Sequence, residues 1–200
     1  MCKQNDRSKR RQLLLRLPGI GSFIEISSDY ASEGAVEYFE KIAPARYWLK
    51  SLGWPILISI LLAAIPYPCG CMPISFKIEA KAHDLALSLI PSLLGFGIGV
   101  YALIFGLSGD LLKKLQDGYV KKELDSGVPA ASAMSINSAF AFPLVTMLVT
   151  IIVASIDKIL SGIQLLSTAT WFLTFFCLVL TYQLIASLYI LGRAVILDKF

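Results

Sequence analysis

The polar side chains inside the apolar segments of this sequence are small hydroxyls and amides, and they are the candidates for chemistry there. Their chemistry is hydrogen bonding: in a membrane they bond the preceding helical turn or a neighbouring helix, or they line a narrow polar conduit when several copies assemble. We predict interhelical hydrogen bonding as their main role and a conduit as the alternative. The candidates for a polar lining are Asn137, Thr146, Thr150, Thr174, Thr181 and Gln183.

A stripe of small residues is the second pattern. Its five members recur at intervals of three, four, three and four, which places them on one face of a helix. In lipid, such a face lets two helix backbones approach closely. The stripe therefore predicts a tight contact within one chain, or an interface between subunits or the wall of a pore. Its members are Ser92, Gly95, Gly99, Ala102 and Gly106.

Two of the four cysteines lie close together, at Cys69 and Cys71. We place them outside the cytoplasm, where a strained disulfide across Gly70 is possible. A zinc site would need two further ligands, and His83 is the only histidine of the chain. We therefore expect no metal site.

No motif in the sequence predicts catalysis. It contains no P-loop, dinucleotide-binding fingerprint or nucleophile elbow, and the glycine-rich run at 95–99 has no strand before it. No Asp, Glu, Lys, Arg or His falls inside the four predicted spans, which argues against proton-coupled transport and voltage gating. We predict a protein that is not an enzyme, with no catalytic residue and no cofactor.

Four apolar segments must position these residues. The 200-residue chain is 56% hydrophobic and only 16% charged, with a mean hydropathy of +0.69. Segments near 18 or more apolar residues match the thickness of a bilayer as helices. We predict an all-α membrane protein with four transmembrane helices as two hairpins. The spans are expected at about 52–66, 85–107, 135–156 and 169–191.

The N-terminal region, residues 1–50, is predicted as a separate basic stretch that lies in the cytoplasm or at the membrane interface. Residues 51–200 form the four-helix transmembrane domain. Within the first part, Ser32 is expected to cap a short helix ending near Ile42, and Leu13–Ile26 is expected to be a lead-in without a span. Pro55 is placed in the first turn of the first span, where proline costs little.

Basic residues predict the orientation of the spans. Fifteen of the 18 Lys and Arg residues fall before the first span, in the loop between the second and third spans, or after the fourth. The positive-inside rule then puts both termini in the cytoplasm. We expect a multi-pass membrane protein with both ends on that side.

The second loop carries a basic cytoplasmic patch. Its lysines alternate with leucines and a tyrosine, which is typical of a segment that anchors to anionic head groups or docks a soluble partner. The docking candidates are Lys113, Lys114, Lys121 and Lys122. No direct nucleic-acid binding is expected.

The four-span layout, the basic cytoplasmic face and the segment PSLLGFGIGVYALIFGL resemble small membrane proteins of bacterial anti-phage systems. The membrane subunit of the Kiwa system and the membrane accessory proteins of some CRISPR systems are examples. The resemblance implies a homo-oligomer in the inner membrane that responds to infection with a cytoplasmic partner. It carries over no functional residue.

Together these features predict an oligomeric sensor or effector that recruits a soluble cytoplasmic protein. The first alternative is a channel or a membrane-permeabilising pore. The second is a membrane-embedded enzyme or assembly factor, which the lack of catalytic polar groups disfavours.

Overall fold

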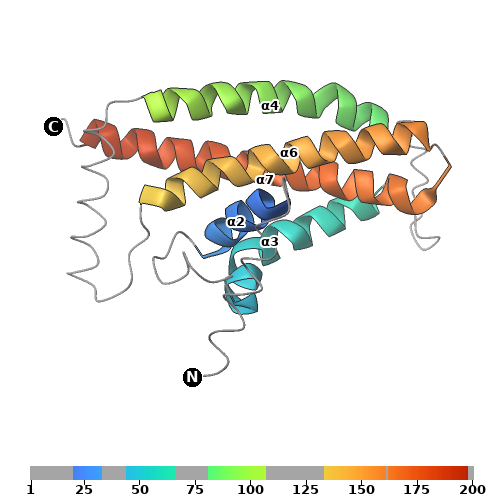
Figure 1. The fold of residues 1–200 in the computed structure, drawn as a ribbon, viewed down its shortest axis with the longest axis horizontal. Coiled ribbons are helices and arrows are strands. Elements are labelled where there is room, and N and C mark those ends of the chain that lie inside the picture. Colours follow the sequence, from blue (N-terminus) through green and yellow to red (C-terminus); the bar gives the residue numbers. More distant parts are fainter. Residues whose placement is uncertain (1–19, 33–43, 66–80, 107–132, 161, 198–200) are drawn as a thin grey trace. The chain divides into compact units, whose positions relative to one another are not determined.

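The computed structural model describes residues 20–32, 44–65, 81–106, 133–160 and 162–197. These residues form five helices and no strand (Figure 1). The helices are α2 (Ile20–Ala31), α3 (Ala45–Ala64), α4 (Ala82–Gly106), α6 (Ala133–Ile159) and α7 (Gln164–Leu197). The predicted all-α class is therefore confirmed for the described chain.

Four of the helices, α3, α4, α6 and α7, are long and apolar enough to cross a membrane, as predicted. Each begins before the predicted span, and α6 and α7 also end after it, because a helix satisfies its own backbone hydrogen bonds and can continue into polar sequence. Helices α3 and α4 end at Ala64 and Gly106, slightly before the predicted ends at 66 and 107. The candidate spans are Ala45–Ala64, Ala82–Ile104, Ile136–Ile159 and Gln164–Ile190. The chain is thus a multi-pass membrane protein.

The longer α3 corrects the predicted position of Pro55. The helix begins at Ala45, so this proline lies in its interior and not in its first turn. Ser59 donates a hydrogen bond to the carbonyl oxygen of Pro55 over 2.6 Å. A serine hydroxyl that donates to the preceding turn in this way has its hydrogen-bond partner within its own helix.

The link between α6 and α7 is shorter than predicted. Residues 157–168 were expected to form it, but α6 continues to Ile159 and α7 begins at Gln164. Gly162 lies between them with a φ of 127°, a backbone conformation that L side chains rarely adopt. A glycine at this point lets the chain turn within a few residues.

The N-terminal region contains a helix that the sequence did not predict. Residues 20–26 were expected to be part of a lead-in, but they form the first half of α2. Ser32 follows the end of this helix, where its backbone N–H donates to the carbonyl of Ser28 over 3.0 Å. The short helix expected over residues 32–42 lies outside the described residues, apart from Ser32 itself.

The chain divides into two compact units. The first comprises Met1–Gly53 and Gly99–Phe142, and the second comprises Trp54–Ile98 and Pro143–Phe200. In the first unit, Tyr30 of α2 stacks on Phe142 of α6 with ring centroids 4.4 Å apart. Burial raises the pKa of the Tyr30 phenol above its ordinary value, so the ring is neutral at physiological pH.

The core of the second unit joins α4, α6 and α7. Ala86 and Ile90 of α4 pack with Met147 and Ala154 of α6 and with Cys177 of α7. A second cluster joins the end of α3 to the starts of α4 and α7 through Ala63, Ala82 and Trp171. The small residues among these allow close helix contacts, as in other membrane helices.

Candidate functional site

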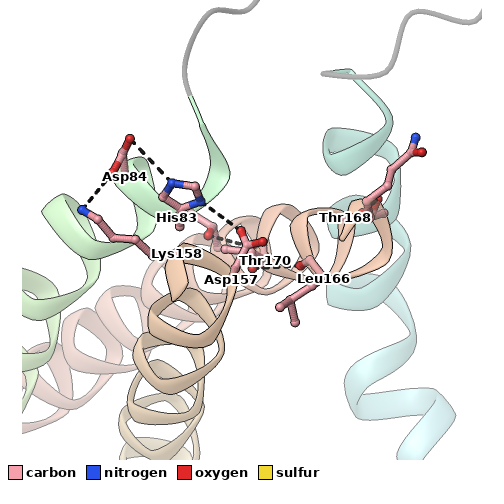
Figure 2. A network of polar contacts seen from close by, with 9 residues as sticks. His83, Asp84, Asp157, Lys158, Leu166, Thr168 and Thr170 are labelled. Carbon is pink, nitrogen blue, oxygen red and sulfur yellow. Dashed lines mark hydrogen bonds and ion pairs between the residues drawn. The ribbon is translucent and has the colours of Figure 1, made fainter. Parts of the chain in front are cut away.

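A buried side-chain hydrogen bond joins the start of α4 to the end of α6 within the second unit. His83 Nδ1 lies 3.2 Å from Asp157 Oδ2, although 74 positions separate the two residues. The exposed fractions of the two side chains are only 11% and 3%. Figure 2 shows the imidazole of His83 between Asp157 of α6 and Asp84 of its own helix.

An ion pair lies beside this hydrogen bond and is more accessible. Lys158 Nζ contacts Asp84 Oδ1 at 3.2 Å, and these side chains are 58% and 56% exposed. Asp84 lies in the first turn of α4 and Lys158 in the last turn of α6, where the helix dipoles favour their charges. His83 Nε2 also lies 3.8 Å from Asp84 Oδ2, which links the two pairs. We call His83, Asp84, Asp157 and Lys158 the polar cluster.

The candidate spans of the structure are longer than the predicted ones and include ionisable side chains. Within the predicted bounds the spans hold no Asp, Glu, Lys, Arg or His, but the longer helices add Arg46 and Lys50 of α3, His83 and Asp84 of α4, and Asp157 and Lys158 of α6. A signal was present: the pairs His83–Asp84 and Asp157–Lys158 flank spans whose alternation puts them at the same membrane surface. The predicted bounds left both pairs in loops.

The cluster chiefly offers proton and charge chemistry. Among the described residues, no group of three or more His, Cys, Asp and Glu side chains is arranged to hold a metal ion. Every buried side-chain nitrogen or oxygen atom there has a hydrogen-bond partner. Burying charge in a membrane span is costly unless the groups pair, and the polar cluster meets that condition.

The small-residue face of α4 is the second candidate site. Its members Ser92, Gly95, Gly99, Ala102 and Gly106 are all exposed. A Cβ atom added at each of the three glycines would meet no described atom within 4 Å. Gly97, by contrast, is buried, and a Cβ atom there would overlap the side chain of Leu144 in α6.

This difference follows from helix geometry. Positions two apart on an α-helix point to nearly opposite sides. Gly97 therefore lies on the side of α4 that faces α6, and Gly95 and Gly99 lie on the opposite side. Among the described residues, the small-residue face makes no contact that would use its small size.

Three of the candidate lining residues, Thr146, Thr150 and Thr174, are buried within the chain. Thr150 Oγ1 donates to the Thr146 carbonyl over 2.8 Å and lies 3.1 Å from Cys177 Sγ of α7. Thr174 Oγ1 donates to the carbonyl of Thr170 over 2.7 Å. These contacts favour the predicted role in interhelical and intrahelical bonding over the alternative of a conduit.

The other three candidate lining residues are half-buried. Asn137 Oδ1 accepts a hydrogen bond from the Tyr101 hydroxyl over 2.8 Å within the first unit. Thr181 Oγ1 donates to the carbonyl of Cys177 over 2.7 Å. The backbone carbonyl oxygen of Gln183 accepts a hydrogen bond from the Ser187 hydroxyl over 2.9 Å. Within the second unit, the Thr150 and Thr181 hydroxyls both contact Cys177, one at its sulfur and one at its backbone carbonyl.

Two predicted sites lie outside the described residues. Cys69 and Cys71 fall in residues 66–80, and the basic patch of Lys113, Lys114, Lys121 and Lys122 falls in residues 107–132. The predicted disulfide and docking surface therefore stay predictions.

Comparison with protein-family models, with curated proteins and with solved structures finds no match to this chain.

Proposed function

We propose that this chain is a self-associating membrane protein whose subunits meet along the small-residue face of α4. The observation that carries the proposal is the exposure of all five members of that face. In lipid there is no hydrophobic force between helices, and close backbone approach at small residues is a main source of association. A second copy packed there would make close contact with a face that meets no described atom of its own chain at its glycines.

The proposed setting is the inner membrane of a bacterium. Four spans arranged as two hairpins place both termini on one side, and fifteen of the 18 basic residues support the cytoplasm as that side. The polar cluster then belongs to the opposite surface. Fusions of a periplasm-active reporter at residue 75 and at residue 200 test this orientation, since only the first should be active.

The proposed role is that of a non-enzymatic sensor or effector that acts with a cytoplasmic protein, in defence against phage infection. Its support is the resemblance of the layout and second span to small anti-phage membrane proteins, together with the basic patch at Lys113–Lys122. A lysine patch at a membrane surface suits an acidic partner or anionic lipid.

Cross-linking of the full-length chain in native membrane vesicles tests self-association. We expect cross-linked oligomers of the wild type and their loss in the double variant Gly95→Leu and Gly99→Leu, because two leucines would hold the helices apart. Gly192→Leu is the matched control, since Gly192 is also exposed with no described atom within 4 Å of a Cβ. Oligomers that survive the double substitution would overturn the proposed interface.

Phage plating tests the biological role. Cells that express the chain with the soluble product of a neighbouring gene should plate phage less efficiently than cells with either protein alone. Neutral Gln substitutions of the four patch lysines should remove that protection and the co-purification of the two proteins. Full protection by the membrane chain alone would count against a cytoplasmic partner.

The alternative is a pore assembled from the same helices. Ion flux through liposomes that contain the purified chain, altered by Gln183→Leu, would favour the pore over the sensor. We expect no such flux, because the buried threonine hydroxyls bond within the chain.

A further inference from the structure

We propose that the exposed ion pair of Asp84 and Lys158 binds the head group of a phospholipid that carries a primary ammonium group, of the phosphatidylethanolamine type. The inference rests on contacts within one chain and does not depend on self-association. It assigns a ligand to a pair of side chains that no part of the proposed function uses.

Both residues lie at the ends of candidate spans, on the same side of the membrane. Asp84 is the third residue of the span Ala82–Ile104, and Lys158 is the last but one of the span Ile136–Ile159. These spans of 23 and 24 residues are about 35 Å long as helices, slightly more than the ~30 Å of hydrocarbon in a bilayer. The pair therefore lies in the head-group layer, which holds the phosphate and ammonium groups of the lipids.

A buried contact holds the pair in place. His83 precedes Asp84 in α4, Asp157 precedes Lys158 in α6, and His83 Nδ1 lies 3.2 Å from Asp157 Oδ2. This contact fixes the start of α4 against the end of α6, and the next residue of each helix reaches the surface. There Lys158 Nζ donates to Asp84 Oδ1 over 3.2 Å, and Figure 2 shows both contacts. The two charges are therefore already positioned before a ligand arrives, which lowers the cost of binding.

The pair keeps hydrogen-bonding capacity for a ligand. The side chains of Lys158 and Asp84 are 58% and 56% exposed. An ammonium group has three N–H donors and a carboxylate has two acceptor oxygens, and the hydrogen bond between them uses one of each. Asp84 Oδ2 lies 3.8 Å from His83 Nε2, which is beyond hydrogen-bond distance. Because an exposed ion pair contributes little stability by itself, a lipid can share its two groups at small cost.

The charges of the pair complement those of a zwitterionic head group. The phosphate of the lipid accepts a hydrogen bond from Lys158, and the ammonium group of the lipid donates one to Asp84; both are charge-assisted and therefore stronger than neutral hydrogen bonds. A purely anionic head group would meet the carboxylate as well as the ammonium group. A choline head group carries the positive charge but has no N–H to donate. Of the three, only the primary ammonium lipid satisfies both side chains.

The surroundings of the pair have room for the rest of the lipid. Ile156 and Ile159 flank Lys158 on α6 and are 42% and 79% exposed, so they offer apolar surface to acyl chains. Asp84 precedes Ser92, the first member of the small-residue face, by eight residues, or about 12 Å along α4. A head group at the pair therefore leaves the small-residue face to a second copy.

Native mass spectrometry of the full chain, released from nanodiscs that contain lipids of equal acyl chains, tests the proposal. The lipids are phosphatidylethanolamine, its N-methyl and N,N-dimethyl derivatives, and phosphatidylcholine, which share one net charge and lose the N–H donors one by one. We expect each lipid with an N–H to be retained roughly fivefold more than phosphatidylcholine, as for one charged contact at a membrane surface. Equal retention of the four lipids would overturn the proposal.

Variants of the pair test which side chains are responsible. Asp84→Asn combined with Lys158→Gln should lower the retention of phosphatidylethanolamine to that of phosphatidylcholine. Asp84→Glu combined with Lys158→Arg keeps both charges and should keep the preference, which separates loss of charge from loss of fold. Arg193→Gln removes an exposed charge near the far end of α7 and is the matched control, with no expected change. A preference that persists in the neutral double variant would also contradict the proposal.

Phosphatidylglycerol distinguishes a site for a zwitterion from a site for phosphate alone. Lys81, which is exposed just before α4, brings a second ammonium group to this end of the helix. We expect the wild type to retain phosphatidylethanolamine more strongly than this anionic lipid. Asp84→Asn alone should reverse that order, because it leaves Lys81 and Lys158 without the exposed carboxylate. Stronger retention of phosphatidylglycerol by the wild type would show that the lysines select a phosphate and that Asp84 has no part in binding.

Discussion

Leu144 of α6 packs against Gly97 of α4 so closely that the glycine has no room for a Cβ atom. The two residues belong to the same compact unit, beside a core that includes Ile90 and Met147. Gly97 is thus a position where small size serves the packing of one chain. The neighbouring Gly95 makes no such contact with the described residues.

This contrast predicts different outcomes for the same substitution at two glycines that lie two residues apart on α4. Gly97→Leu should lower the free energy of unfolding by about 1–3 kcal/mol or more, because the added side chain forces α4 away from Leu144. Gly95→Leu should leave that free energy nearly unchanged. Unfolding of each variant in mixed detergent micelles with increasing SDS measures both values. Equal destabilisation by the two variants would contradict the assignment of the two faces of α4.

The hydrogen bond between Tyr101 and Asn137 predicts a measurable coupling between α4 and α6 in the first unit. Tyr101→Phe and Asn137→Ala should each cost about 1 kcal/mol, and the double variant should cost less than their sum. A double-mutant cycle in the same SDS titration gives the coupling energy. Strict additivity of the two single effects would show that the bond contributes no stability.

Cys177 should resist thiol reagents while the chain is folded. It is fully buried, and its sulfur contacts the hydroxyl of Thr150. In a variant with Ser at positions 2, 69 and 71, we expect N-ethylmaleimide to modify Cys177 only as fast as the chain unfolds. Thr168→Cys in that background, exposed at the start of α7, is the positive control. Similar labelling rates at the two sites would contradict the burial of Cys177.

Gly162, in the turn between α6 and α7, should tolerate a β-carbon less well than a glycine inside a helix. Gly162→Ala should destabilise the chain by about 1–3 kcal/mol, because its positive φ strains any L side chain. Gly192→Ala is the matched control within α7, where alanine favours the helix by about 0.5–1 kcal/mol. Thermal unfolding of both variants measures whether each substitution lowers or raises the unfolding temperature. Stabilisation by Gly162→Ala would argue against the positive φ.

The membrane character and the four long helices could be predicted from the sequence, because hydrophobic length reports directly on the solvent that a segment meets. The ends of the helices could not. Hydropathy falls where polar residues such as His83 and Asp157 begin, but the hydrogen bonds of the helix continue through them. Helix α2 was missed for a related reason. Its serines and glycine weaken the helical pattern in the sequence, and tertiary packing against Phe142 stabilises the helix instead.

The sequence and the tertiary structure determine different properties of the small-residue stripe. Spacing alone determined that Ser92, Gly95, Gly99, Ala102 and Gly106 share one face of a helix, because the period of an α-helix is a local property. Only the tertiary structure decided that Gly97, on the other face, is the residue that packs against α6. Likewise, the pairing of His83 with Asp157 joins residues 74 positions apart. Such a contact depends on how helices pack, which no local pattern encodes.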